Sequence, residues 1–518
     1  MFKKIFAFLL LTSYLFSKPL NLPGIENETK PKLNVIYKNI DTRSIIQNFA
    51  FYNLYPDTNE GKQALKKGWN LLNQKDISSA ISLPILDINM MISLVNKKSS
   101  LILEDLDENQ LVFLESLGAD LKNRSLKGHN IWSIKETRNL NNDDIDLSRA
   151  LFLEDFGEDP DGKYKIRYYE ITLDLMALQI LANLDNKRSD LDIINAMNDY
   201  IFYIMRFRFP PHSVHAKHID TFTFLSTVMD SQRGVCLGVS TLYLTLAQRL
   251  GVKLESITPP GHIYVRYVDK NGNITNIETT ARGVDYPSDV YLGIETKKLE
   301  KREIKEVVGL AFINQASVFW SNEEYEKALQ LYEKASYYIK NDSTLDEMIG
   351  LNYLFTNNKI EGEKYLLPLK DHKSEYSTYK DSLIEDYFNN KTDVESIKAI
   401  FTPVDETRES ILKKQDELKK IVDKFPFFRA GLMQLANTYL QLGREKEALI
   451  YLNKLSKIDA LNPVVNYYLS AIYFERLDYL SSLEFFKKTY DILNNENHIP
   501  KAIRELKFAL KSKCPDKI

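Results

Sequence analysis

The segment 231–279 constrains the fold of this chain more than any other part of the sequence. A helix is predicted from Cys236 to Gly251, because its apolar residues fall on one helical face and glycine favours a stop. Those apolar residues are Val239, Leu242, Tyr243, Leu246 and Leu250. Turn sequences at 259–261 and 269–273 then bracket alternating residues and a returning strand, the pattern of a β-hairpin. The segment therefore predicts a buried helix followed by two antiparallel strands.

Cys236 stands at the N-terminus of the predicted helix. Unpaired N–H groups and the helix dipole favour negative charge there, and the thiolate is the nucleophilic form of cysteine. The same N–H groups can hold an oxyanion. His262, which follows a glycine at the start of the first strand, is suitably placed to act as the base. Cys236 and His262 are therefore candidates for a nucleophile and its base.

The third candidate residue follows from the geometry of the hairpin. If the turn centres on Lys270, the residue opposite His262 is Glu278, and opposed residues share one face of a sheet. Glu278 would then accept the His262 N–H and hold the tautomer of the ring. A one-residue slip would put Thr279 there instead, and Asn276 is a weaker substitute on the same face. Each signal alone is weak, because such residues more often serve packing or turns; their order along the chain is more specific.

Three motifs carry a family resemblance: RGVCLG at 233–238, PGHIYVR at 260–266 and NIETT at 276–280. They resemble the transglutaminase-like superfamily, most of all a bacterial branch whose core is followed by tetratricopeptide repeats. The resemblance covers about 190–285 well. It implies a papain-like α+β core with Cys236, His262 and Glu278 as the catalytic triad. The family's third residue is commonly Asp, where this chain has Glu278. Gln232 is a candidate for oxyanion support by proximity alone.

Residues 305–510 are predicted to form helical repeats. Tyr325, Ala328, Tyr332 and Ala335 recur at helical spacing, and the windows 432–452 and 469–486 abut. Their period of about 34 residues is the tetratricopeptide length. Large residues that meet small ones form the core of such repeats, and the concave face is the place for a protein partner. The predicted fold is a papain-like α+β core followed by an all-α tetratricopeptide-type domain, mostly helical overall.

The N-terminus predicts an export signal. Lys3 and Lys4 precede an apolar run from Ile5 to Phe16. A run of about 12 residues suits a signal peptide and is short for a membrane-spanning helix. Leu15 is large for a cleavage site, so an uncleaved N-terminal membrane anchor remains an alternative. We expect a signal peptide at 1–18 and a periplasmic or secreted protein.

The remaining divisions follow from these features. Residues 19–165 are predicted to be a mostly helical region to which no chemistry can be assigned. The transglutaminase-like cysteine hydrolase core is expected at 166–300 and the repeats at 305–510. A role in packing against the core is the simplest interpretation of the N-terminal region.

Charge and residue usage argue against several classes of function. The net charge of −3 does not suit nucleic acid as a main partner. A disulfide between the two cysteines, Cys236 and Cys514, would consume the candidate nucleophile. The imidazole side chains of His212, His215 and His218 suit zinc as ligands. Their spacing, in a segment that follows two prolines, is not a metalloprotease signature. A solvated loop is the favoured interpretation, and we expect no metal and no cofactor.

These observations favour a cysteine-dependent amide hydrolase or acyltransferase that acts on peptide or protein in the cell envelope, with repeats that recruit a partner or substrate. Such an enzyme would be a cysteine protease, an amidase or transglutaminase-like. Water or an amine would resolve the acyl-enzyme, and the sequence leaves both open. The alternative is a non-catalytic tetratricopeptide interaction protein with a relic core, so the sequence alone does not decide that the protein is an enzyme.

Overall fold

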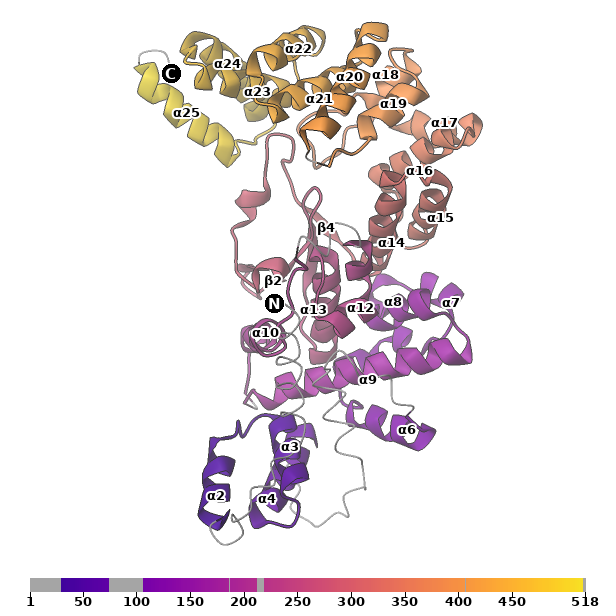
Figure 1. Cartoon of the computed structure of the whole chain (residues 1–518), viewed down its shortest axis with the longest axis vertical. Coiled ribbons are helices and arrows are strands. Elements are labelled where there is room, and N and C mark those ends of the chain that lie inside the picture. Colours follow the sequence, from indigo (N-terminus) through magenta and orange to yellow (C-terminus); the bar gives the residue numbers. More distant parts are fainter. Residues whose placement is uncertain (1–28, 74–105, 186, 212–218, 406, 516–518) are drawn as a thin grey trace, which may run out of the picture. The chain divides into compact units, whose positions relative to one another are not determined.

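The computed structural model describes residues 29–73, 106–185, 187–211, 219–405 and 407–515 (Figure 1). The predicted signal peptide at 1–18 and the three histidines 212, 215 and 218 lie outside these residues. The chain divides into two compact units, one of Met1–Leu106 with Leu178–Asn186 and one of Asp107–Ala177 with Lys187–Ile518. Within the described residues, no helix combines the length and apolar character needed to cross a membrane.

The first unit contains helices α2 (Thr29–Asn39), α3 (Ile45–Leu54) and α4 (Asn59–Asn73). The Ser44 side chain accepts a hydrogen bond from the backbone N–H of Gln47, which caps the start of α3. Phe49 and Trp69 are buried and pack edge to face, with ring centroids 5.5 Å apart. This aromatic contact therefore joins α3 to α4 in the part of the unit that the structure describes.

Helix α13 (Cys236–Leu250) lies at the centre of the second unit. Every residue from Leu237 to Ala247 is buried. A Cβ atom at Gly238 would meet the carbonyl oxygen of Phe222 at 2.2 Å, so glycine allows α13 to approach η5 (Ile219–Thr223) closely. Gly251 ends the helix in the left-handed conformation, with φ 77°. The predicted helix and its glycine stop are confirmed.

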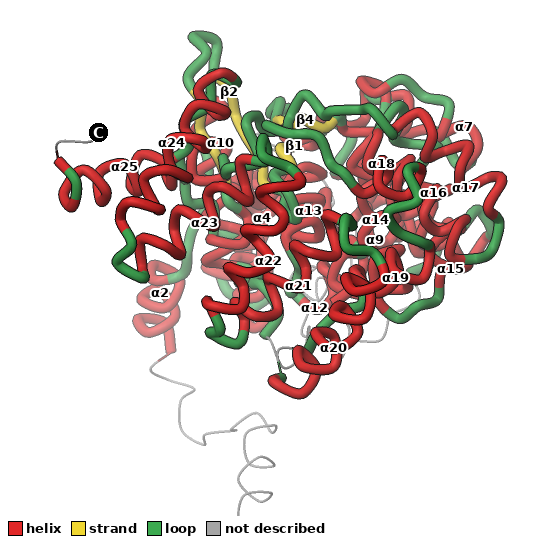
Figure 2. The backbone as a smooth tube through the Cα atoms, turned by 90° about the horizontal axis from the view of Figure 1, so that it is seen from above, coloured by secondary structure: helices red, strands yellow, loops and turns green. Residues whose placement is uncertain are grey.

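A four-stranded antiparallel sheet accompanies α13, with strand order β3-β2-β1-β4. The strands are β1 (Glu255–Thr258), β2 (Tyr264–Val268), β3 (Ile274–Ile277) and β4 (Glu300–Arg302). Strands β2 and β3 form the predicted hairpin, which is confirmed. Figure 2 shows how small the sheet is beside the helices, and the prediction of a mostly helical chain with an α+β core is confirmed as well.

The register of the hairpin differs from the predicted one. Val268 pairs with Ile274, so the turn centres on Asn271 and not on Lys270. The Asp269 side chain accepts hydrogen bonds from the N–H groups of Asn271 and Asn273, and this closes a five-residue loop. The pairing extrapolates to Tyr264 opposite Glu278, so the predicted direct opposition of His262 and Glu278 is wrong. A shift of two positions nevertheless leaves both residues on the same face.

Residues 107–177 contact α13 through a buried ion pair and a hydrogen bond. The completely buried Arg249 side chain donates to Asp174 on α9 (Pro160–Ala182) at 2.8 Å and to the Ser148 hydroxyl at 3.1 Å. Nearby, Arg149 binds both carboxylate oxygens of Glu170, at 2.9 and 2.6 Å. Ser148 and Arg149 belong to α8 (Leu147–Phe156), which contacts α13. The part of the N-terminal region after residue 106 therefore packs against the helix that begins with Cys236.

Paired helices follow the sheet. The pairs are α14 with α15 (Ile304–Ser321, Tyr325–Ala335), α16 with α17 (Ser343–Phe355, Lys359–Leu366), α21 with α22 (Arg429–Gln441, Glu445–Ile458) and α23 with α24 (Pro463–Glu475, Tyr479–Asn495). Helices α21 and α23 begin about one tetratricopeptide period apart. Fully buried alanines such as Ala328, Ala436 and Ala448 let these helices approach one another. The predicted tetratricopeptide-type fold is confirmed.

The pairing is interrupted between residues 377 and 428. Helices α18 (Leu383–Phe388), α19 (Val394–Phe401) and α20 (Arg408–Lys424) occupy this stretch, and α25 (Lys501–Lys513) follows the last pair. In Figure 1 these helices run from orange to yellow along the chain. The paired helices are therefore not continuous across the predicted repeat region 305–510.

The segment 278–299, which connects β3 to β4, is bound to the C-terminal part of the chain. His498 Nε2 lies 2.7 Å from the carbonyl oxygen of Gly293, and Lys297 pairs with Glu496 at 2.7 Å. Ile294 packs against the apolar cluster that includes Leu483 and Ile503. This connecting segment therefore follows a path that the end of the repeat domain supports.

Candidate active site

Cys236 is the first residue of α13 and is half-buried. The loop before it is held by backbone hydrogen bonds: Arg208 N–H donates to the carbonyl of Gln232, and Gly234 N–H donates to the carbonyl of Arg208. The first bond of the helix runs from Val239 N–H to the carbonyl of Val235. The N–H groups of the first turn have no acceptor within the helix itself, so they can donate to negative charge beside the sulfur.

A tight turn presents His262. Its N–H donates to the carbonyl oxygen of Pro259 at 3.0 Å, and Gly261 has φ 68°. A left-handed residue in the third position of a turn requires glycine, and proline before it suits a type II turn. No atom lies within 4 Å of a Cβ built on Gly261, so the backbone conformation and not crowding selects glycine there. His262 stands just before β2, which begins at Tyr264.

The structure brings His262 and Glu278 together. The Nε2 atom of His262 lies 2.7 Å from Oε2 of Glu278, and the Glu278 side chain is 6% exposed. The other carboxylate oxygen accepts hydrogen bonds from the N–H and hydroxyl of Thr280, at 3.2 and 2.7 Å. One carboxylate oxygen of Glu278 therefore faces the imidazole, and Thr280 holds the other.

The two alternatives to Glu278 are engaged elsewhere. The hydroxyl of Thr279 lies 2.9 Å from that of Ser240 on α13. The side chain of Asn276 accepts a hydrogen bond from Arg266 and donates to the carbonyl of Tyr286. Glu278 is therefore the only one of the three that contacts His262 in the described structure.

Tyr291 is a site residue that sequence reasoning missed. Its hydroxyl donates to Oε2 of Glu278 at 2.6 Å, the oxygen that also faces His262. Its ring stacks on His262 and on Tyr264, with centroids 5.9 and 4.7 Å apart. No sequence motif marks Tyr291, because its contact with Glu278 depends on the path of the connecting segment 278–299.

The electrostatics favour charge on both partners. Burial lowers the pKa of His262, but hydrogen bonds with Cys236 and Glu278 outweigh it and raise the pKa to about 9. Burial raises the pKa of Glu278, but hydrogen bonds from His262, Tyr291 and Thr280 bring it down to about 2. At neutral pH an imidazolium therefore lies between a carboxylate and the thiol. Because Nε2 faces Glu278, Nδ1 is the ring nitrogen left for Cys236.

The side chain of Gln232 does not line the cavity beside Cys236. Gln232 ends α12 (Leu225–Ser231) in the left-handed conformation, with φ 54°. Its backbone carbonyl is bonded to Arg208, and its side chain is half-buried. Oxyanion support by Gln232 stays a prediction, and the N–H groups at the start of α13 are the donors closest in sequence to the sulfur.

One group of side chains among the described residues has the composition of a metal site. His129, Asp146 and Glu170 place ligand atoms within 4.8 Å of one another. Asp146 is already bonded to His129 at 2.9 Å, and Glu170 is bound by Arg149. Because the guanidinium of Arg149 would oppose a cation, this group belongs to the buried ion pairs around α13.

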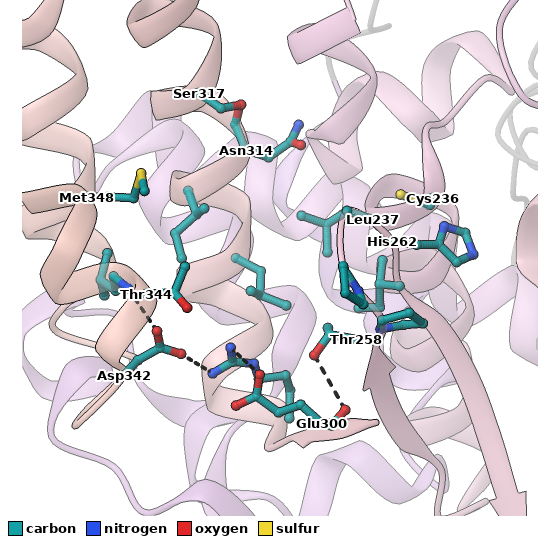
Figure 3. A pocket seen from close by; sticks show the side chains of 18 of the residues that line it. Cys236, Leu237, Thr258, His262, Glu300, Asn314, Ser317, Asp342, Thr344 and Met348 are labelled. Atoms are coloured by element: carbon teal, nitrogen blue, oxygen red, sulfur yellow. Dashed lines mark hydrogen bonds and ion pairs between the residues drawn. The ribbon is translucent and has the colours of Figure 1, made fainter. Parts of the chain in front are cut away.

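A cavity of about 350 Å³ adjoins the thiol and the imidazole. Figure 3 shows Cys236 and His262 on one side of it, and Met348 and Thr344 of α16 on the other. Asn314 and Ser317 project from α14, and Glu300 and Asp342 lie at a third side. The first repeat helices therefore form part of the surroundings of the candidate site.

Residues 167–330 match the sequence model of the family described as "Transglutaminase-like superfamily". This range contains Cys236, His262, Glu278 and Tyr291. No curated protein matches the chain.

Three solved structures show a distant similarity. TTC0263, a thermophilic TPR protein of Thermus thermophilus, is 15% identical, and the match covers 39% of this chain and 98% of that chain with a TM-score of 0.22. The Cut9–Hcn1 hetero-tetramer of the APC/C is 12% identical over 89% of this chain and 74% of that chain, with a TM-score of 0.20. The human IFIT1 dimer is 13% identical over 95% and 86%, with a TM-score of 0.19. At such TM-scores these similarities do not bear on the arrangement described above.

Proposed function

Because residues 167–330 form a domain of the transglutaminase-like superfamily, we propose that this protein is a cysteine-dependent amide hydrolase or acyltransferase that acts on peptides or proteins. One observation carries the proposal. His262 is bonded to Glu278 at 2.7 Å through Nε2, it lines one cavity together with Cys236, and its interactions with Cys236 and Glu278 raise its pKa to about 9. A base fixed between a carboxylate and a thiol at a helix N-terminus is the arrangement that nucleophilic thiol chemistry needs.

In the first half-reaction, the thiolate of Cys236 attacks the amide carbonyl carbon and forms a C–S bond. The carbonyl electrons move to oxygen, and N–H groups at the start of α13 stabilise that oxyanion. The imidazolium of His262 gives its proton to the amide nitrogen, the C–N bond breaks and the amine leaves. A thioester on Cys236 and a neutral His262 remain.

In the second half-reaction, neutral His262 takes a proton from the incoming nucleophile, which attacks the thioester. The C–S bond breaks and the thiolate is restored beside the imidazolium. Water as the nucleophile releases a carboxylic acid, and an amine releases a new amide. Hydrolysis is the favoured outcome, because water is always present at high concentration.

The proposed setting is the cell envelope. The basic and apolar N-terminal residues support export to the periplasm or secretion, and the helical repeats support recruitment of a protein partner or substrate. Fusion of residues 1–30 to a reporter that is active only outside the cytoplasm tests the location. Reporter activity that is lost when Leu9 and Leu10 are changed to Asp supports export, and an inactive fusion contradicts it.

The alkylation of Cys236 by iodoacetamide tests the chemistry without knowledge of the substrate. In a Cys514→Ser background, the expected rate stays high well below pH ~8.5, the ordinary pKa of a thiol, and falls in His262→Ala. Slow alkylation that is indifferent to His262 would contradict the proposal and would favour an interaction protein with a relic core.

A further inference from the structure

The cavity beside the thiol has walls from two parts of the chain. Cys236, Leu237 and the turn 259–263 form the side that belongs to the core. The opposite side comes from the first two repeat pairs, with Leu310 and Ile313 on α14, Tyr332 on α15, and Leu345 and Met348 on α16. Because Cys236 and His262 are part of the lining, any group that enters the cavity lies next to the reacting sulfur.

The far wall combines apolar side chains with polar ones of α14 and α16, and apolar surface makes up most of the lining of the whole cavity. Leu310, Ile313 and Met348 are half-buried, so each side chain retains surface that a ligand can cover. Leu345 and Tyr332 behind them are 3% exposed, and they anchor this wall in the interior of the repeats. Removal of such surface from water favours the binding of an apolar group.

The charged residues at the polar end of the cavity form ion pairs with one another. Arg302 lies 2.7 Å from Glu300 and 2.6 Å from Asp342, and the dashed lines in Figure 3 mark both contacts. Asp342 also accepts a hydrogen bond from Leu345 N–H at the start of α16. These charges are engaged with one another, so the space between them and the thiol is bordered mostly by apolar side chains.

We propose that this cavity is the specificity pocket of the enzyme and takes a bulky apolar side chain of the peptide substrate, close to the scissile carbonyl. The inference rests on the proposed function and adds to it the class of substrate. A volume of about 350 Å³ holds one or two large side chains. The first repeat helices are therefore part of the substrate site, in addition to any partner that the other repeats bind.

Dipeptidyl chloromethyl ketones test the pocket directly, because the thiolate displaces chloride and forms a stable thioether on Cys236. The reference probe carries N-acetyl-Ala-Ala, and each other probe has Phe or Lys in place of one of the two alanines. Labelling of the Cys514→Ser protein is followed by mass spectrometry. Each rate is divided by the iodoacetamide rate of the same variant, so that a change in thiol reactivity cancels. A Phe probe is expected to label about tenfold faster than the Ala-Ala probe on this relative scale.

Two substitutions and one control connect the preference to the cavity. Met348→Trp fills the space, and Ile313→Ala removes part of its wall without added bulk, so both are expected to lower the preference for Phe. Ile360→Trp introduces the same bulk at a position on α17 that is 81% exposed and outside the cavity lining, and it should keep the preference. Agreement of the two substitutions guards against misfolding of either one.

The outcomes separate the pocket from the chemistry. Equal relative rates for all probes, or faster labelling by a Lys probe, overturn the apolar pocket while His262-dependent alkylation by iodoacetamide leaves the proposed function intact. Alkylation that ignores His262 overturns the proposed function itself. A Phe preference that survives both Met348→Trp and Ile313→Ala places the selection elsewhere and also overturns the inference.

Discussion

His262 and Glu278 are in contact at 2.7 Å although the strand register extrapolates to Tyr264, and not His262, opposite Glu278. The turn before β2 and the length of the glutamate side chain together allow this diagonal contact. This explains how Glu can stand where the resemblance leads one to expect Asp. The contact has a measurable consequence, because a carboxylate beside an imidazole stabilises its charged form.

Glu278→Asp and Glu278→Gln separate the length of this side chain from its charge. Asp keeps the charge but is one methylene shorter, and Gln keeps the length but is neutral. Both should lower the pKa of His262 from about 9 toward its ordinary 6.5, with Gln giving the larger shift. NMR titration of the His262 ring measures the pKa, and alkylation of Cys236 should slow at pH 7. An unchanged His262 pKa in Glu278→Gln would show that the carboxylate does not control the base.

Tyr291→Phe tests a positioning role for Tyr291. The substitution keeps the ring that stacks on His262 and removes the hydroxyl that donates to Glu278 at 2.6 Å. The pKa of Glu278 should rise from about 2, so that the acid limb of the alkylation profile moves to higher pH. The rate at neutral pH should fall by about three- to tenfold, since a hydrogen bond to a charged group is lost. Tyr286→Phe, an exposed tyrosine in the same segment, is the matched control and should leave the profile in place.

The pKa values of His262 and Glu278 predict how the stability of the fold depends on pH. The folded pKa of His262 is raised from 6.5 to about 9, so its stabilising contribution is complete below about 6.5 and lost as pH rises through about 9. The folded pKa of Glu278 is lowered from 4.5 to about 2, so its contribution is present above about 4.5 and lost as pH falls through about 2. Both contributions coexist between about pH 4.5 and 6.5.

Thermal unfolding of the wild type and of His262→Ala measures this dependence. The difference in Tm should be largest in the window where both contributions coexist and should shrink toward pH 9. A difference that stays constant from pH 5 to pH 9 would show that the imidazole does not gain a charged partner on folding.

Arg249→Ala should destabilise the core. The side chain of Arg249 is fully buried against Asp174, so its removal leaves a buried carboxylate without this partner. Loss of one member of such a pair costs about 3–5 kcal/mol in unfolding free energy, measurable by urea denaturation. Lys253→Ala, an exposed position just after the same helix, should change stability by less than about 0.5 kcal/mol. A small effect of Arg249→Ala would mean that water or Arg124 compensates for the lost charge.

Local sequence patterns were sufficient to predict the helix and the hairpin of the core. Helical periodicity and Gly251 located α13 and placed Cys236 at its start, and two turn sequences located the hairpin with His262 before it. The same reasoning gave the correct face for Glu278 but the wrong register, because the loop closed by Asp269 cannot be read from alternation alone. The short strands β1 and β4 were not predicted, since four and three residues leave too little pattern.

The sequence by itself determined the elements and the order of Cys236, His262 and Glu278, because helix periodicity, turn chemistry and motif order are local properties. Only the tertiary structure decided that Tyr291 reaches Glu278 and that Met348 faces Cys236 across a cavity. Those positions depend on the path of the connecting segment and on how the first repeat helices pack against the core. Such long-range packing is set by contacts between residues far apart in the chain, which no short window of sequence contains.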